Sequence, residues 1–167
     1  DGVTEAKAVA SGTTLAPATP RDSSRYATAL RTSRSALNSY EAMVGGRNEL
    51  VRPYEMTLAV SAARDLALVR RTRDAASVGR SLQEPFAAVT MPAKDKVTLG
   101  ARDASFPLPI VSTLDYPVQV VIELESSDRI EFPRNRIEKT LHKGRQVFDI
   151  QVKTRAPGAT PVKITLR

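Results

Sequence analysis

Two different hydrophobic periods divide this chain. Over residues 26–44, apolar or small side chains recur every three or four positions and therefore share one face of a helix. They are Tyr26, Leu30, Ser33, Leu37, Tyr40 and Val44. Gly45 and Gly46 then favour the end of that helix, because glycine adopts the left-handed conformation at little cost. An amphipathic helix of this kind needs a partner to pack against.

Further helical pattern follows from Pro53, which suits the first turn of a second helix. The apolar face predicted for this helix comprises Met56, Ala59, Val60 and Ala63. A third helical stretch over residues 66–83 places Leu66, Val69, Ala76 and Leu82 inward and Arg70, Arg71, Arg73 and Arg80 outward. The period leaves open whether residues 54–83 form two helices or one. Pro85 predicts that helical structure ends at or just before Glu84.

From Val97 the hydrophobic period changes to two, which predicts strands with one buried face. About seven short strands are expected, the number and spacing typical of an immunoglobulin-like sandwich. Their ranges are 97–101, 106–113, 117–126, 129–132, 136–141, 145–155 and 160–167. Pro107 and Pro109 cannot donate to a ladder, so their strand is expected to lie at an edge or to switch sheets. The last strand is barely complete at Arg167, and a further strand is expected beyond it.

The sequence therefore predicts an α+β fold in three parts. Residues 1–24 are small, polar and proline-containing, which indicates a flexible linker. Residues 25–91 are expected to form a small antiparallel helical bundle of about three helices. Residues 92–167 are expected to form an immunoglobulin-like antiparallel β-sandwich that lacks a last strand.

Composition narrows the chemistry available to this chain. Its 167 residues are 41% hydrophobic and 26% charged, which fits one globular domain or two small ones. It contains no cysteine and a single histidine, His142, so disulfides, thiol nucleophiles and Cys-ligated metals are excluded. No apolar run approaches the roughly 20 residues that span a bilayer. The start at Asp1 is neither a signal peptide nor an initiator Met, so we expect a processed piece of a longer protein.

The formal net charge is +7, spread along the chain rather than gathered in one block. Diffuse charge of this kind does not predict a specific nucleic-acid reader, which would add a clustered stripe with aromatic residues. One group of arginines stands out: Arg64, Arg70, Arg71, Arg73 and Arg80. Because guanidinium forks bind phosphate and carboxylate, the group is a candidate contact for an anionic polymer or an acidic partner helix. The alternative is a solvated helix face that contains arginine rather than lysine because the genome is GC-rich.

Other polar residues give weaker catalytic or metal candidates. His142 lies beside a turn, and no Gly-x-Ser-x-Gly elbow supplies a nucleophile for it, so a surface histidine is expected. Glu123 and Glu125 share one face of a strand about 7 Å apart, where pairing with Lys or Arg across strands is the ordinary arrangement. Asp128 and Glu131 flank a turn with Glu125 but lack the spacing of a calcium loop. We expect no catalytic residue, no cofactor and no metal site.

Three segments together resemble an actinobacterial cell-surface family of unknown function, encoded beside the lipid II flippase gene. They are residues 58–64 (LAVSAAR), 86–91 (FAAVTM) and 106–120 (FPLPIVSTLDYPVQV). The resemblance covers roughly residues 25–167, the C-terminal half of that family, with Ser112 where the family typically has Asn. It implies a parent protein with a signal peptide, a large extracellular region and one C-terminal transmembrane helix.

The resemblance also sets the functional expectation. It implies a non-catalytic interaction or spacer module on the extracytoplasmic face of the cell membrane, near cell-wall precursor export. The expected partner is an envelope protein, and membrane contact is expected only through an anchor outside this segment. An accessory domain that binds anionic wall polymer or glycan is the alternative. An enzyme would need its site in the upstream region of the parent protein.

Overall fold

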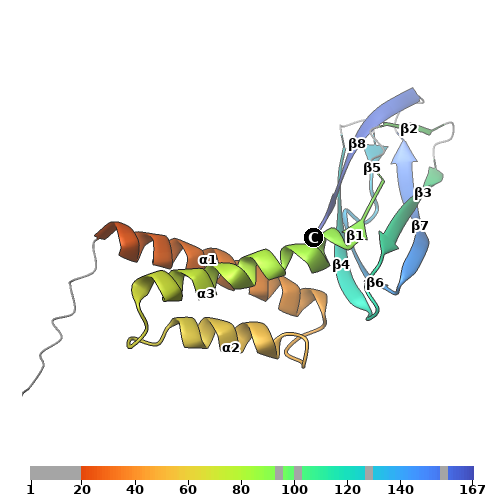
Figure 1. Cartoon of the computed structure of the whole chain (residues 1–167). Coiled ribbons are helices and arrows are strands. Elements are labelled where there is room, and N and C mark those ends of the chain that lie inside the picture. Colours follow the sequence, from red (N-terminus) through yellow and green to blue (C-terminus); the bar gives the residue numbers. More distant parts are fainter. Residues whose placement is uncertain (1–19, 93–95, 100–102, 127–129, 155–157) are drawn as a thin grey trace, which may run out of the picture.

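Helices occupy one end of the molecule and two β-sheets the other (Figure 1). The computed structural model describes residues 20–92, 96–99, 103–126, 130–154 and 158–167. The helices are α1 (Pro20–Met43), α2 (Arg52–Ser61), α3 (Leu68–Ser81) and α4 (Gln83–Ala87). The strands are β1 (Val89–Thr90), β2 (Lys96–Leu99), β3 (Asp103–Ser112), β4 (Val118–Ser126), β5 (Ile130–Glu131), β6 (Arg136–Leu141), β7 (Gly144–Thr154) and β8 (Gly158–Leu166). Helices followed by antiparallel sheets confirm the predicted α+β class.

The first helix follows its predicted stripe but starts earlier than expected. α1 begins at Pro20, inside the range 1–24 that the sequence assigned to a linker. Proline is tolerated in a first helical turn because its missing N–H would have no intrahelical partner there. The helix ends as predicted at Gly45 and Gly46, both with positive φ. The Gly46 N–H donates to the Glu41 carbonyl at 2.8 Å, which closes the last turn. Residues 1–19 lie outside the described residues.

The three long helices form an up-down-up bundle held by small residues at one seam. α1 and α3 run in the same direction, and α2 runs in the opposite direction, from the end of α1 toward the start of α3 (Figure 1). The buried Ser33 hydroxyl donates to the Ala75 carbonyl at 2.6 Å and accepts from the Gly79 N–H at 3.1 Å. A Cβ at Gly79 would lie 2.9 Å from the Ser33 Oγ. The absence of a side chain at Gly79 therefore lets α1 and α3 approach closely.

The structure separates residues 54–83 into two helices, α2 and α3, and their predicted apolar faces are correct only in part: Ala63, Leu66 and Ala76 are half-buried. Met56 is 60% exposed and Val69 is 72% exposed. The fully buried positions of these helices and of the segments that flank them are Val51, Leu58, Ser61, Ala75, Val78, Leu82 and Pro85. Small residues occupy the seam where the helices approach, so the inward face is not the most apolar one. Leu82 is buried as predicted.

Helical structure also continues past the predicted end at Glu84. After a break at Leu82, the short helix α4 includes Pro85. Pro85 lies in the first turn of α4, where no backbone N–H is required. The chain then enters β1, and the N–H of Thr113 donates to the Ala88 carbonyl at 3.0 Å. The last residues assigned to the bundle therefore already belong to a sheet.

The strands match the predicted ranges closely, with β1 added, and form two four-stranded antiparallel sheets. Their orders are β1-β3-β7-β5 and β2-β8-β4-β6. The pairs are nested: β4 pairs with β6, β3 with β7, and β2 with β8. Alternate side chains of both sheets form the buried core between them, among them Leu108, Ile122 and Ile150.

This nested pairing differs from the immunoglobulin order that the sequence predicted. A constant-type immunoglobulin domain holds strands A, B, E and D in one sheet and C, F and G in the other. In the first sheet, strand B, the second along the chain, pairs with strand E, the fifth. Among the described strands that follow β1, the second and fifth are β3 and β6, and they lie in different sheets. Hydrophobic alternation fixes each strand and its buried face, but it carries no information about which strands pair.

The prediction for the proline-containing strand is confirmed. β3 pairs with β7 over its whole length through residues 103–112. On its other side, the described strands offer only β1, which pairs with Val111 and Ser112. Pro107 and Pro109 thus lie where β3 is an edge strand, as their missing N–H groups require.

Candidate functional site

The five arginines singled out in the sequence do not form one cluster. Arg64 lies in the turn between α2 and α3, and the other four lie on α3. Arg70, Arg73 and Arg80 are exposed, as the sequence predicted, whereas Arg71 is half-buried. Their separation follows from helix geometry, because neighbouring positions point about 100° apart around the axis.

Arg71 has a packing role instead of the predicted outward position. Its guanidinium carbon lies 4.3 Å from the centre of the Tyr26 ring, and its Nε–H donates to the Ser61 carbonyl at 3.0 Å. These contacts join α1, α2 and α3 at the end of the bundle far from the sandwich. Arg70 also differs from the rest, because the Asp74 carboxylate lies 3.8 Å away and partly neutralises it.

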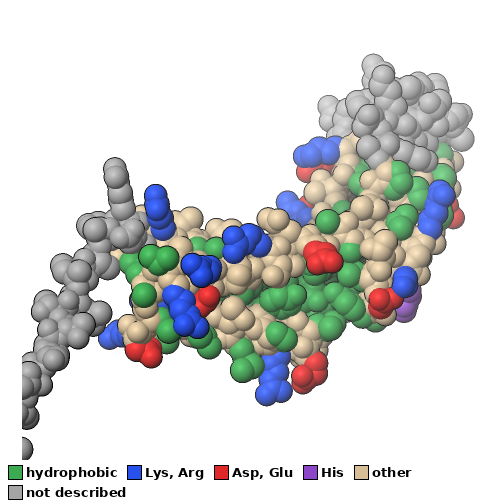
Figure 2. Space-filling view, viewed as in Figure 1, with side chains coloured by type: hydrophobic (Ala, Val, Ile, Leu, Met, Phe, Trp, Pro, Cys, Tyr) green, Lys and Arg blue, Asp and Glu red, His purple; other side chains and the backbone are tan. Residues whose placement is uncertain are grey.

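Arg73 and Arg80 line one shallow pocket, and Arg25 of α1 joins them. We call it the arginine pocket; its volume is about 340 Å³, and it is lined by Arg25, Leu68, Val69, Thr72, Arg73, Ala76 and Arg80. Three arginines therefore line the pocket together with Leu68, Val69 and Ala76, and no Asp or Glu is among the lining residues. Over the face drawn in Figure 2, several basic side chains, all of them arginines by the sequence, lie on the helical part of the molecule, and others lie on the sandwich.

The arginine pocket has the chemistry of a shallow anion site. Arginine stays protonated at every physiological pH, and its fork matches phosphate and carboxylate oxygens. The Thr72 hydroxyl donates to the Leu68 carbonyl at 2.8 Å, so it would contribute only its lone pairs. Sequence reasoning missed Arg25 because only the parallel packing of α1 against α3 brings it to Arg73.

The weaker polar candidates behave as ordinary surface residues. His142 is exposed, and its backbone N–H donates to the Gln146 side chain at 2.8 Å. The Arg167 Nε lies 3.0 Å from a Glu123 carboxylate oxygen, and the Lys163 Nζ lies 3.0 Å from Glu125. The predicted pairing of both glutamates across strands is confirmed.

Metal and membrane candidates can be assessed only for the part of the chain that the structure describes. Asp128, from the weak calcium candidate, lies outside the described residues. Among the described residues, no group of three or more His, Asp or Glu side chains could hold a metal ion. None of the described helices combines the length and apolar composition that a membrane span requires.

The joint between the helices and the sandwich is built around one side chain. Tyr40, on the last turns of α1, is only 2% exposed. Its ring meets Tyr54 of α2 edge-on at 5.7 Å between centres and Phe86 of α4 at 6.4 Å. Its hydroxyl lies 2.8 Å from that of Tyr116, in the loop between β3 and β4. Tyr40 therefore ties three helices to the sandwich.

The environment of this joint favours neutral tyrosines. Burial raises the pKa of Tyr40 far above the ordinary value for tyrosine. The hydrogen bond with Tyr116 and electrostatic interactions with Tyr116 and Tyr54 add to this effect. Burial also raises the pKa of Tyr54, with smaller contributions from Tyr116 and Glu84. Among the described residues, no buried side-chain nitrogen or oxygen lacks a hydrogen-bond partner. The joint is thus a packed interface with its polar groups satisfied.

Comparison with known proteins finds no matching protein-family model and no significantly similar curated sequence.

Proposed function

We propose that this chain is a non-catalytic, extracytoplasmic interaction or spacer module of a membrane-anchored cell-envelope protein, linked to cell-wall precursor export. The observation that carries the proposal is the Tyr40 joint. A buried aromatic contact with a satisfied hydroxyl pair holds the bundle at a fixed orientation to the sandwich. A fixed orientation is what a spacer needs in order to position neighbouring domains. The envelope setting rests on the sequence resemblance alone.

We also infer a finer class for the sandwich than an antiparallel α+β domain. The three nested pairs, β4 with β6, β3 with β7, and β2 with β8, support a jelly-roll-like winding over the immunoglobulin-like one expected from the sequence. Both architectures serve as binding and scaffold domains, so the functional proposal does not depend on the choice.

A pair of spin labels tests the rigid-spacer part of the proposal. Cysteines introduced at the exposed Thr28 and Lys153 would be the only ones in the chain, so each label has one attachment site. Pulsed electron-spin distance measurement should give one narrow distribution for the otherwise native protein. The same pair in Tyr40→Ala should give a broad one, because the joint loses its central contact. A broad distribution in the native background would overturn the proposal.

Capture from cell fractions tests the interaction part. The native protein is immobilised and exposed to solubilised membrane and wall fractions of an actinobacterium, with washes at low and high salt. Capture of one membrane protein that resists salt supports the interaction module, because contacts between exposed charges are screened by salt. A module that retains nothing acts as a spacer alone.

The arginine pocket favours a second function, binding of an anionic wall polymer. We propose polyphosphate and polyglutamate as probes, because they separate phosphate from carboxylate recognition. The double variant Arg73→Gln/Arg80→Gln should bind at least about tenfold more weakly, since each lost charge-assisted contact contributes about 1.5–3 kcal/mol. The double variant Arg64→Gln/Arg70→Gln is the matched control: both arginines are exposed, and it removes the same two charges outside the pocket. Equal losses in both variants would mean that diffuse charge alone attracts the polymer.

A further inference from the structure

One long edge of the sandwich carries no neighbouring strand in the described part of the chain. β7 pairs with β3 through ten residue pairs, from Gly144 to Lys153. On its other side, the described strands offer only β5, which pairs with Lys153 and Thr154. Residues 144–152 of β7 therefore form an open edge beside the short strand β5.

The prolines of β3 determine which β7 backbone groups face this edge. Pro107 is opposite Asp149 and Pro109 is opposite Val147. Because proline cannot donate, these are non-hydrogen-bonded pairs, in which both residues direct their N–H and C=O groups away from each other. Thr113 follows β3 directly and has the same parity as the two prolines, and its N–H donates away from β7, to the Ala88 carbonyl at 3.0 Å.

On β7, the alternate residues that include the partners of the two prolines are Arg145, Val147, Asp149 and Gln151, and we call these four residues the β7 edge. By this alternation their backbone groups face outward from the sheet edge. All four are exposed, and Val147 is 55% exposed. The edge thus presents a row of donors and acceptors in the arrangement that accepts another strand.

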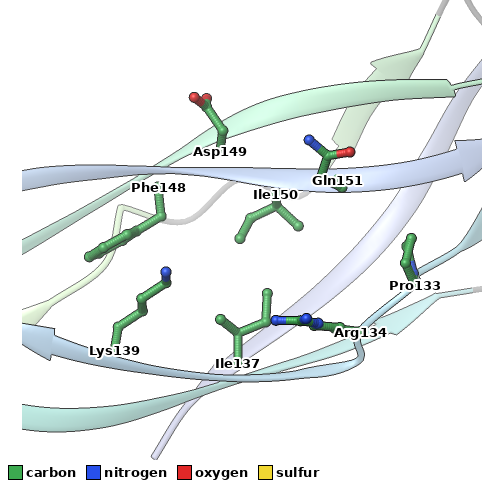
Figure 3. A pocket seen from close by; sticks show the side chains of 8 residues that line it. All are labelled: Pro133, Arg134, Ile137, Lys139, Phe148, Asp149, Ile150 and Gln151. Carbon is green, nitrogen blue, oxygen red and sulfur yellow. The ribbon is translucent and has the colours of Figure 1, made fainter.

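A pocket of about 310 Å³ opens between the two sheets beside this edge. In Figure 3, Phe148 and Ile150 of β7 point into it, and Ile137 and Lys139 of β6 point toward them from the other sheet. Asp149 and Gln151 point the opposite way. The inward side chains of a strand added to the β7 edge would enter the same space between the sheets.

The charges around the pocket describe the segment that would fit. Lys139 and Arg134 supply its two cations, and the Lys139 Nζ lies 5.4 Å from the centre of the Phe148 ring. The one acidic lining residue, Asp149, points away from the pocket. An incoming inward acid would therefore meet two cations, and flanking apolar side chains would meet Ile137 and Phe148.

The two neighbouring edges differ in how they are protected. β6, the outer strand of its sheet, carries Lys139 at an inward position, and an inward charge on an edge strand discourages further pairing. The inward positions of β7 beside the pocket, Gln146, Phe148 and Ile150, are uncharged. The device that blocks strand addition at β6 is thus missing from β7. A second copy of this chain would bring the same two cations, Lys139 and Arg134, toward the interface, which disfavours self-pairing.

We propose that the β7 edge binds an extended segment of a partner protein as an added strand. Its inward positions carry apolar residues with one Asp or Glu, which lies near Lys139 and Arg134. The backbone ladder supplies affinity and the pocket supplies specificity, as in other cases of β-strand addition. This inference rests on the proposed interaction function and names the surface and the chemistry of the partner.

A designed peptide tests this assignment. The probe is a short blocked peptide whose inward positions read Val, Glu and Val, with Thr between them; in the control peptide Lys replaces Glu. In the isotope-labelled protein, the Glu peptide should shift and protect the amides of Val147 and Asp149. The Lys peptide should bind more weakly, and Lys139→Met should reduce the difference between the two peptides.

Two substitutions at one position separate backbone pairing from side-chain contact. Val147→Pro removes an outward N–H without touching the ladder to β3, whereas Val147→Thr keeps it. The proline variant should bind the Glu peptide about tenfold more weakly, which corresponds to one lost hydrogen bond, and the threonine variant should bind it as the native protein does. Circular dichroism checks that both variants are folded.

Several results would overturn the assignment. They are equal binding by the two variants, absence of binding by the native protein, and dimerisation of the native protein that Val147→Pro abolishes. The last result would make a second copy the occupant. The spin-label distances report on the spacer function separately: a narrow native distribution without peptide binding refutes only the edge assignment. A broad native distribution refutes the spacer function whatever the peptide does.

Discussion

A double-mutant cycle between Tyr40 and Tyr116 tests whether the bundle and the sandwich form one coupled unit. The two hydroxyls are 2.8 Å apart and belong to different parts of the fold. Tyr40→Phe and Tyr116→Phe each remove one hydroxyl and leave both rings in place. The cycle therefore isolates the hydrogen bond across the joint from the packing around it.

The expected coupling follows from the burial of the pair. A neutral hydrogen bond contributes about 1 kcal/mol net. Tyr116 is half-buried, so its hydroxyl can reach water when Tyr40 is Phe, which limits the cost of an unsatisfied group. We expect Tyr40→Phe to lower the free energy of unfolding by about 1 kcal/mol and Tyr116→Phe by about 1–3 kcal/mol, because the second variant leaves the buried Tyr40 hydroxyl without its partner. The double variant should cost less than the sum of the two single variants. Tyr40→Ala should cost about 3–5 kcal/mol, because it also leaves a cavity.

Urea unfolding followed by far-ultraviolet circular dichroism measures these free energies, since the chain has no Trp to serve as a fluorescent probe. Tyr26→Phe combined with Tyr116→Phe is the control. Tyr26 lies at the other end of the bundle, so that pair should be additive. If the effects of the Tyr40 and Tyr116 substitutions add within about 0.3 kcal/mol, the hydrogen bond does not couple the bundle to the sandwich.

Two further predictions concern the bundle seam and the tyrosines of the joint. Gly79→Ala should lower the free energy of unfolding by about 1–3 kcal/mol in thermal or urea unfolding, because its Cβ would meet the Ser33 Oγ at 2.9 Å; a stabilised variant would mean that the higher helix propensity of Ala outweighs this contact. Stability should also fall as the pH rises above about 10, because unfolded tyrosines ionise there while Tyr40 and Tyr54 stay protonated in the folded protein. Urea midpoints measured against pH should show a shallower fall in Tyr40→Phe, and an equal fall would refute this origin.

The sequence predicted only part of the candidate site. Arginine spacing on α3 predicted three exposed side chains correctly, because helix period alone determines which positions share a face. The same spacing assigned Arg71 outward, although it packs on Tyr26. Arg25 was missed because it approaches Arg73 only through the packing of α1 on α3. The β7 edge depends on strand order, for which the sequence carries no local pattern.

By itself, the sequence determined the local elements of this protein. The three- and four-residue stripe of α1, its glycine stop and the positions of the strands all follow from backbone geometry and side-chain alternation within one segment. The edge position of β3 follows from two prolines that cannot donate.

Only the tertiary structure decided how these elements face one another. Small residues such as Ser61 and Gly79 turn inward because another helix approaches there, while Val69 stays exposed. Nested strand pairing and the central contact of Tyr40 join residues far apart in the chain. Such contacts are selected by the total burial and hydrogen bonding of the whole fold, which no single periodic segment specifies.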